Sequence, residues 1–161
     1  MSVYNRLRAA GNVKRYHTVQ IIGEQTVSAH SFNVAMLCLA IKPDASFDLI
    51  KAALFHDLAE LETGDIPAQV KWSNQDLEVQ LKIIENRFDQ AHDINVELTR
   101  EEERILKIAD LLELCYFCVE QKRLGNDTIL PILGRGVKKL KEYDLNATAK
   151  IMLEDLLSGV R

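Results

Sequence analysis

Apolar residues recur at helical spacing along most of this chain, and no stretch alternates apolar and polar residues as a strand does. The pattern predicts an all-α protein, a helical bundle of about six helices. The chain has 161 residues, 47% of them hydrophobic, which is enough to bury one core. We therefore expect a single domain over residues 1–161.

Capping residues, glycines and prolines predict the limits of the helices. Ser28 is the expected N-cap of the second helix and Pro43 follows its end. Thr99 and Glu102 have the spacing of a capping box at the start of the fifth helix, which the break at Gly125 ends. The expected helices span residues 4–10, 29–41, 47–61, 75–92, 99–124 and, after a loop at Pro131, 136–157.

Composition excludes several classes of protein. The formal net charge of −4 gives no general attraction to DNA or to an anionic membrane. No apolar run approaches the roughly 18 to 20 residues that span a bilayer, and the first residues lack an export signal, so a cytoplasmic location is expected.

Cys38, Cys115 and Cys118 lie in apolar segments and are expected to be reduced core residues. The alternative for the C-x-x-C pair, a redox site or half of a zinc site, has no second cysteine pair to complete it.

Ionisable residues interrupt the apolar segments at three places. His56 and Asp57 follow the most apolar stretch of the chain, where two adjacent ionisable side chains are costly to bury unless they are paired or bind a metal. A hydrogen-bonded core histidine beside an ion-paired aspartate would explain this dipeptide alone. However, His30 and Asp110 interrupt two other predicted helices. Imidazole and carboxylate groups together suit a divalent ion such as Mn, Co, Zn or Fe, and four such ligands leave positions open for catalysis.

Other charged residues lie near these candidate ligands. Glu60 comes four residues after His56, which places both on one face of the predicted helix and makes Glu60 a candidate proton shuttle. Asp65, in the turn that follows, is a second candidate for this role. Arg15 and Lys71 could meet phosphate oxygens. The alternatives are a solvated helix-end acid for Glu60, an ordinary turn aspartate for Asp65, and solvated cations.

The order His30, His56-Asp57, Asp110 on successive helices resembles the HD-domain metal-dependent phosphohydrolases. Segments 26–31, 56–71 and 105–114 look like bacterial 5′-deoxynucleotidases of the YfbR type, and the resemblance covers about residues 6–123. It implies a single HD domain in which His30, His56, Asp57 and Asp110 hold the ion. By the same resemblance, Glu60 and Asp65 assist the attack of a metal-bound water on phosphorus, and Arg15 binds the substrate.

The resemblance also implies a cofactor and partners. The expected ion is Co²⁺, Mn²⁺ or Zn²⁺, with Mg²⁺ as the candidate for a second site. The expected partners are a deoxynucleotide substrate and further copies of the chain, as a dimer or a hexamer, with no DNA and no membrane. Exposed hydrophobic helix faces also favour such a homo-oligomer.

Within this family, the short chain and the segment 10–18 look most similar to phage dATP triphosphohydrolases. That resemblance implies release of triphosphate and deoxyadenosine from dATP, in phages that replace adenine by 2-aminoadenine and therefore in the host cytoplasm. It places Tyr16 and Thr18 near the base, with Tyr16 where relatives often have tryptophan. The alternatives are a 5′-deoxynucleotidase limited to monophosphates, a cyclic-nucleotide phosphodiesterase, and a non-catalytic HD module that binds a nucleotide.

Overall fold

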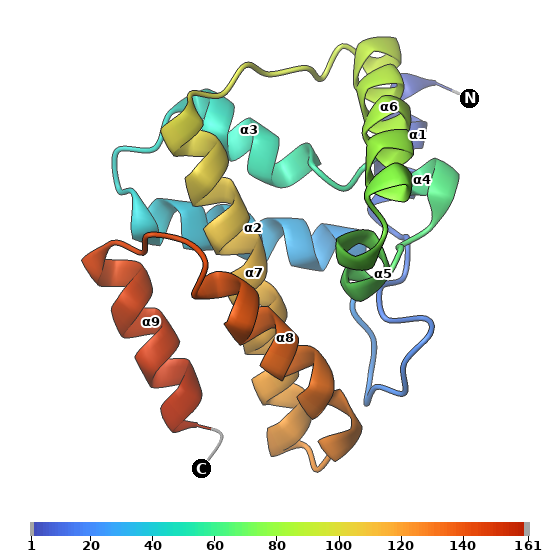
Figure 1. Cartoon of the computed structure of the whole chain (residues 1–161). Helices are drawn as coiled ribbons and strands as arrows, with labels where there is room; N and C mark the ends of the chain where they lie inside the picture. Colours follow the sequence, from blue (N-terminus) through green and yellow to red (C-terminus); the bar gives the residue numbers. More distant parts are fainter. Residues whose placement is uncertain (1, 160–161) are drawn as a thin grey trace.

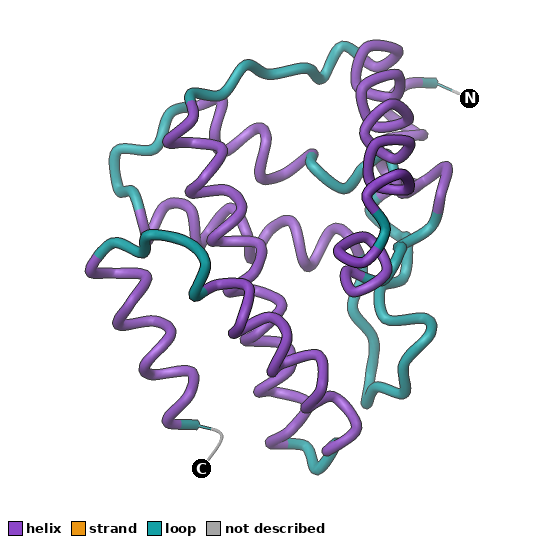
Figure 2. The backbone as a smooth tube through the Cα atoms, in the orientation of Figure 1, coloured by secondary structure: helices purple, strands orange, loops and turns teal. Residues whose placement is uncertain are grey.

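The computed structural model describes residues 2–159, and this part of the chain is a bundle of nine α-helices and one short 3₁₀ helix without a sheet (Figures 1 and 2). The all-α prediction is confirmed, although the helices outnumber the six expected. None of the described helices has the length and apolar character needed to cross a lipid bilayer. The elements are α1 (Val3–Ala10), α2 (Val27–Ile41), α3 (Phe47–Phe55), α4 (Glu60–Thr63), α5 (Ala68–Ser73), α6 (Gln75–His92), α7 (Arg100–Arg123), η1 (Asp127–Ile129), α8 (Leu130–Leu140) and α9 (Ala147–Ser158).

Helix α7 is the central element, with α2, α3, α8 and α9 packed around it (Figure 1). It begins with the predicted capping box, in which the Thr99 hydroxyl accepts from the Glu102 backbone N–H at 3.2 Å. The Glu102 carboxylate accepts from the Thr99 N–H at 2.9 Å in return. Its buried face joins the other four helices in the main hydrophobic core, which also holds the free cysteines Cys38, Cys115 and Cys118.

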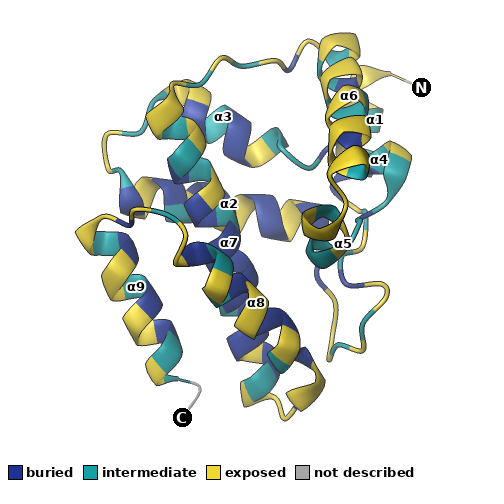
Figure 3. Ribbon diagram, viewed as in Figure 1, coloured by how far each residue is buried: buried dark blue, intermediate teal, exposed yellow. Residues whose placement is uncertain are grey.

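A second, smaller cluster of buried side chains lies apart from the main core. It consists of Ala10, Val27, Leu58, Ala59, Phe88 and Ile94. Helix α6 covers it while exposing most of its own surface, with Leu81 and Phe88 as its buried residues (Figure 3). Residues 56–59 form the turn that leads from α3 in the main core to this smaller cluster.

The prediction of one helix over residues 47–61 is wrong, because α3 ends at Phe55. The His56 ring nitrogen Nδ1 donates to the Ala53 carbonyl at 2.9 Å, and a continued helix would need that carbonyl for the N–H of Asp57. The chain then tightens into bonds of 3₁₀ spacing, such as Glu60 N–H to Asp57 carbonyl at 3.0 Å. His56 and Asp57 therefore lie on a turn instead of within a helix.

Two other predicted boundaries need correction. Helix α2 begins at Val27 because Thr26, not Ser28, is the N-cap and accepts from the Ala29 N–H at 3.3 Å. The expected helix over 136–157 is two helices, separated where Asn146 caps α9 and also donates to the Ile41 carbonyl at 3.0 Å. Pro131 lies in the first turn of α8, where its missing N–H costs nothing, and not in a loop.

Two glycines of α8 test how closely α7 and α8 pack. A Cβ atom at Gly136 would lie 2.8 Å from Leu114 Cδ2 and 2.9 Å from Cys115 Sγ, whereas nothing lies within 4 Å of one at Gly134. We expect Gly136→Ala to lower the free energy of unfolding by ~1–3 kcal/mol through overpacking. Gly134→Ala should raise it by ~0.5–1 kcal/mol, because alanine is the better helix former. Urea unfolding of both variants measures the difference, and equal midpoints would contradict the close approach.

Candidate metal centre and active site

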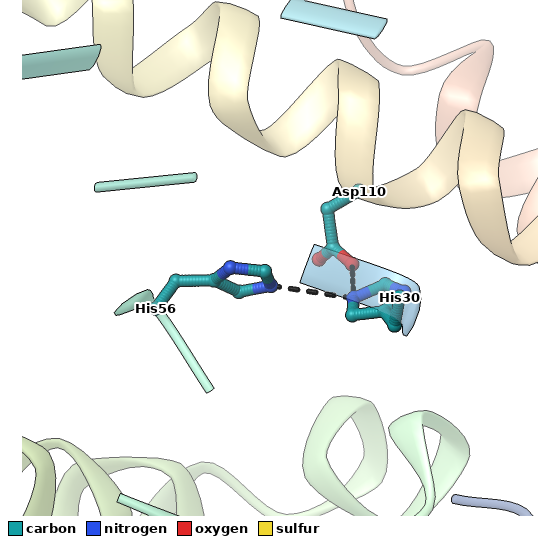
Figure 4. Close-up of side chains that lie close together, drawn as sticks. All are labelled: His30, His56 and Asp110. Carbon is teal, nitrogen blue, oxygen red and sulfur yellow. Dashed lines mark hydrogen bonds and ion pairs between the residues drawn. The ribbon is translucent and has the colours of Figure 1, made fainter. Parts of the chain in front are cut away.

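Three of the predicted ligands meet at one point between α2, α7 and the turn after α3. His30, His56 and Asp110 each offer a donor atom, and these atoms lie within 4.8 Å of one another (Figure 4). His30 Nε2 is 3.3 Å from His56 Nε2 and 3.2 Å from Asp110 Oδ1. Because the three residues come from separate elements, the packing of the main core determines their spacing.

The hydrogen bonds of both imidazoles leave their Nε2 atoms directed at this point. Nδ1 of His56 donates to the Ala53 carbonyl at 2.9 Å, and Nδ1 of His30 lies 2.5 Å from Glu113 Oε2. Two nitrogens that are each about 2.0–2.1 Å from one ion are roughly 3–3.4 Å apart, which matches the observed separation. The donor set therefore fits a single divalent transition metal ion.

Asp57 lies beside His30 and His56, but its carboxylate forms an ion pair with Arg15. Its Oδ2 atom is 3.5 Å from His30 Nε2 and 3.4 Å from His56 Nε2, yet only 2.6 Å from an Arg15 guanidinium nitrogen. Burial would raise the pKa of Asp57, but the charges of His56, Arg15 and His30 hold it well below its usual range. Asp57 is thus an anion next to the histidines, and its role as a fourth ligand remains a prediction.

Glu60, the first residue of α4, is a buried acid whose carboxylate oxygens have no hydrogen-bond partner among the described residues. The nearest cation is Lys71, whose Nζ is 3.6 Å from Glu60 Oε1. Burial and the negative charge of Asp57 raise the pKa of Glu60 to about 8. With His56 and Asp57, both side chains line a pocket that is open to solvent. Glu60 is thus a buried acid beside Asp57, and its role as the proton shuttle stays a prediction.

Asp65 organises the loop that carries Arg15. Its Oδ2 atom accepts from the Tyr16 backbone N–H at 2.9 Å, and Tyr16 has a left-handed backbone with φ of 59°. Tyr16 turns inward and stacks on Phe117 with ring centroids 4.5 Å apart, so one face of its ring is covered. Thr18 is exposed and lines a second pocket together with Arg15, Tyr16 and Asp65. The structure thus links Asp65 to Arg15 and Tyr16 and leaves any direct role for Asp65 in proton transfer a prediction.

Two buried polar residues beside the site were not predicted. Glu113 contacts His30, and Gln25 contacts both Glu113 and Arg15. A signal for Glu113 was present, because it interrupts the apolar run 111–114 one helical turn after Asp110. The sequence contained no such signal for Gln25, because this residue lies in a polar segment without periodicity.

The fold and the site together define the class of protein. A helical bundle that brings a histidine of α2, a histidine after α3 and an aspartate of α7 to one point, beside a buried acid, has the arrangement expected of an HD-domain phosphohydrolase. A sequence model described as YfbR-like 5′-deoxynucleotidase matches residues 2–96. The chain belongs to this YfbR-like family, and it is an enzyme of the phosphohydrolase class.

Individual relatives agree with this assignment. A 5′-deoxynucleotidase of Shewanella oneidensis is 30% identical over 88% of this chain and 85% of the relative. The 5′-deoxynucleotidase YfbR of Salmonella typhi is 29% identical over 71% of this chain and 70% of its own. Since the family is enzymatic, the alternative of a non-catalytic HD module is set aside.

Solved structures share the fold. The HD phosphohydrolase DatZ of cyanophage S-2L, whose structure holds dA and one catalytic Zn²⁺ ion, matches with a TM-score of 0.72 at 22% identity. The match covers 99% of this chain and 96% of that one. An HD-domain phosphohydrolase of Listeria innocua matches with a TM-score of 0.73 at 23% identity, over 98% of this chain and 90% of that one.

Proposed function

We propose that this enzyme is a metal-dependent 5′-deoxynucleotidase, which hydrolyses deoxynucleoside 5′-monophosphates to the deoxynucleoside and phosphate. The observation that carries the proposal is the convergence of His30, His56 and Asp110 beside the buried Glu60, in a chain of the YfbR-like family. The substrate class comes from the two relatives described above, both of which are named 5′-deoxynucleotidases.

The residues of the site have separate tasks in this reaction. A divalent ion, held by His30, His56, Asp110 and, we propose, Asp57, would lower the pKa of water and polarise the phosphoryl group. Arg15 and Lys71 supply positive charge to the phosphate oxygens. Glu60 exchanges the proton, because it is an acid of raised pKa with no competing hydrogen bond. Asp65 holds the Arg15 loop through the Tyr16 N–H.

The charge of the site favours a monophosphate over a triphosphate. Among the described residues that line the two pockets, the permanently cationic side chains are Arg15 and Lys71. Arg15 is already paired with Asp57 at 2.6 Å, and Lys71 lies 3.6 Å from Glu60. A triphosphate brings about twice the negative charge of a monophosphate into pockets that are also lined by Asp57, Glu60, Asp65 and Glu85. Triphosphate hydrolysis of dATP is the second candidate, and it rests on the similarity of segment 10–18 to phage dATP triphosphohydrolases.

One assay decides between the two candidates. The purified enzyme is incubated with Co²⁺ or Mn²⁺ and with separate deoxynucleoside monophosphates, deoxynucleoside triphosphates and a cyclic nucleotide, and the products are resolved by ion-exchange chromatography. We expect metal-dependent release of deoxynucleosides from the monophosphates and little cleavage of dATP. Intact triphosphate released mainly from dATP would establish the second candidate. Cleavage of the cyclic nucleotide alone, or of nothing, would refute both.

A further inference from the structure

Glu113 is a fully partnered carboxylate in the interior of α7, with 3% of its surface exposed. Its Oε2 atom lies 2.5 Å from Nδ1 of His30. Its Oε1 atom accepts from Gln25 Nε2 at 2.7 Å and from Asn33 Nδ2 at 3.4 Å. Burying a carboxylate is costly without such partners, so this residue is poorly explained as a contribution to the core alone.

Gln25 connects Glu113 to Arg15 through two hydrogen bonds. Its amide oxygen accepts from Arg15 Nε at 3.2 Å, and its amide nitrogen donates to Glu113. The contact with Arg15 fixes the orientation of the amide, because a guanidinium can only donate. Arg15, Gln25, Glu113 and His30 thus form one buried, hydrogen-bonded row.

We infer that Glu113 is a positioning residue that orients His30 toward the metal ion, with Gln25 tying this support to Arg15. The inference rests on the proposed metal-dependent function. A carboxylate that accepts from Nδ1–H holds the imidazole in the form whose Nε2 lone pair is free. It also makes that nitrogen a stronger ligand and prevents rotation of the ring. The row further couples the position of the substrate-binding arginine to the position of the ligand.

Metal affinity is the quantity that tests this role. Glu113→Gln keeps the shape of the side chain but removes its charge, and we expect it to weaken Co²⁺ binding by about 10- to 100-fold in calorimetric titration. The d–d absorption spectrum of bound Co²⁺ should change as well. The matched control is Glu102→Gln, which disturbs the same helix at its capping box, away from the site. This variant should bind Co²⁺ as the unaltered protein does, even where its unfolding midpoint falls.

These measurements distinguish a failure of the positioning role of Glu113 from a failure of the proposed metal-dependent function. Equal Co²⁺ affinity of Glu113→Gln and the unaltered protein would overturn the positioning role alone, as would an equal loss in the Glu102→Gln control. Failure of the unaltered protein to bind Co²⁺ would overturn the metal-dependent function together with the inference.

A measurement on the unaltered protein covers the case in which Glu113→Gln does not fold. Nitrogen-15 spectra of the histidine rings in the Zn²⁺-loaded protein should show His30 protonated at Nδ1 and coordinated through Nε2. A bare or metal-bound Nδ1 in these spectra would overturn the inference.

Discussion

Replacing Asp110 with alanine is expected to remove the bound metal ion and to abolish turnover. Asp110 supplies the carboxylate of the three-residue donor group, and its Oδ1 atom lies 3.2 Å from His30 Nε2. Its loss also leaves a buried imidazole without this partner. We therefore expect the free energy of unfolding to fall by roughly 1–3 kcal/mol. Metal content by mass spectrometry, turnover and urea unfolding measure the three effects.

The control for this variant is Glu103→Ala, which removes an exposed acid from the same helix. It should retain metal, turnover and stability. Turnover by an Asp110→Ala protein that contains no metal would show that the reaction takes place elsewhere, and would refute the site.

Glu60→Gln is expected to keep the metal ion and to lower kcat by about 10²- to 10⁴-fold. Glutamine has the shape of glutamate, but its side-chain amide cannot take up and release a proton near neutral pH. The large effect follows from the position of Glu60, which is buried beside Asp57 and has a pKa raised to about 8. Steady-state kinetics at saturating Co²⁺, together with metal analysis of the same sample, provide the measurement.

Glu62→Gln is the matched control, because Glu62 is two residues further on, exposed, and paired with Arg6 at 2.8 Å. We expect its kinetics to equal those of the unaltered enzyme. A Glu60→Gln enzyme with full activity would move the proton transfer to Asp65. Loss of the metal in that variant would instead make Glu60 a ligand.

The sequence was sufficient to predict the helical class and to single out three residues that the structure brings together, because both depend on local patterns. Helical periodicity predicted the limits of α6 correctly, and the spacing of Thr99 and Glu102 predicted the capping box at the start of α7. Ionisable residues in apolar segments gave His30, His56 and Asp110, since the cost of burying them needs an explanation.

Features that depend on tertiary contacts were beyond the reach of the sequence. The end of α3 is determined by the bond of the His56 ring to Ala53, and the pattern of apolar residues continues through it. The break before α9 involves a contact of Asn146 with Ile41, about a hundred residues away in the chain. Likewise, Gln25 acquires its significance only when α7 brings Glu113 beside it.

The turn at residues 56–59 joins two hydrophobic clusters of unequal size. On one side, His30 and Asp110 lie on helices of the main core, while Glu60 follows Leu58 and Ala59 of the smaller cluster. Regions with few buried apolar contacts open locally at a lower free energy than the whole domain. We therefore expect the free energy of local opening around Glu60 to be set by the smaller cluster. Such an opening would disrupt the catalytic arrangement while most of the bundle stays folded.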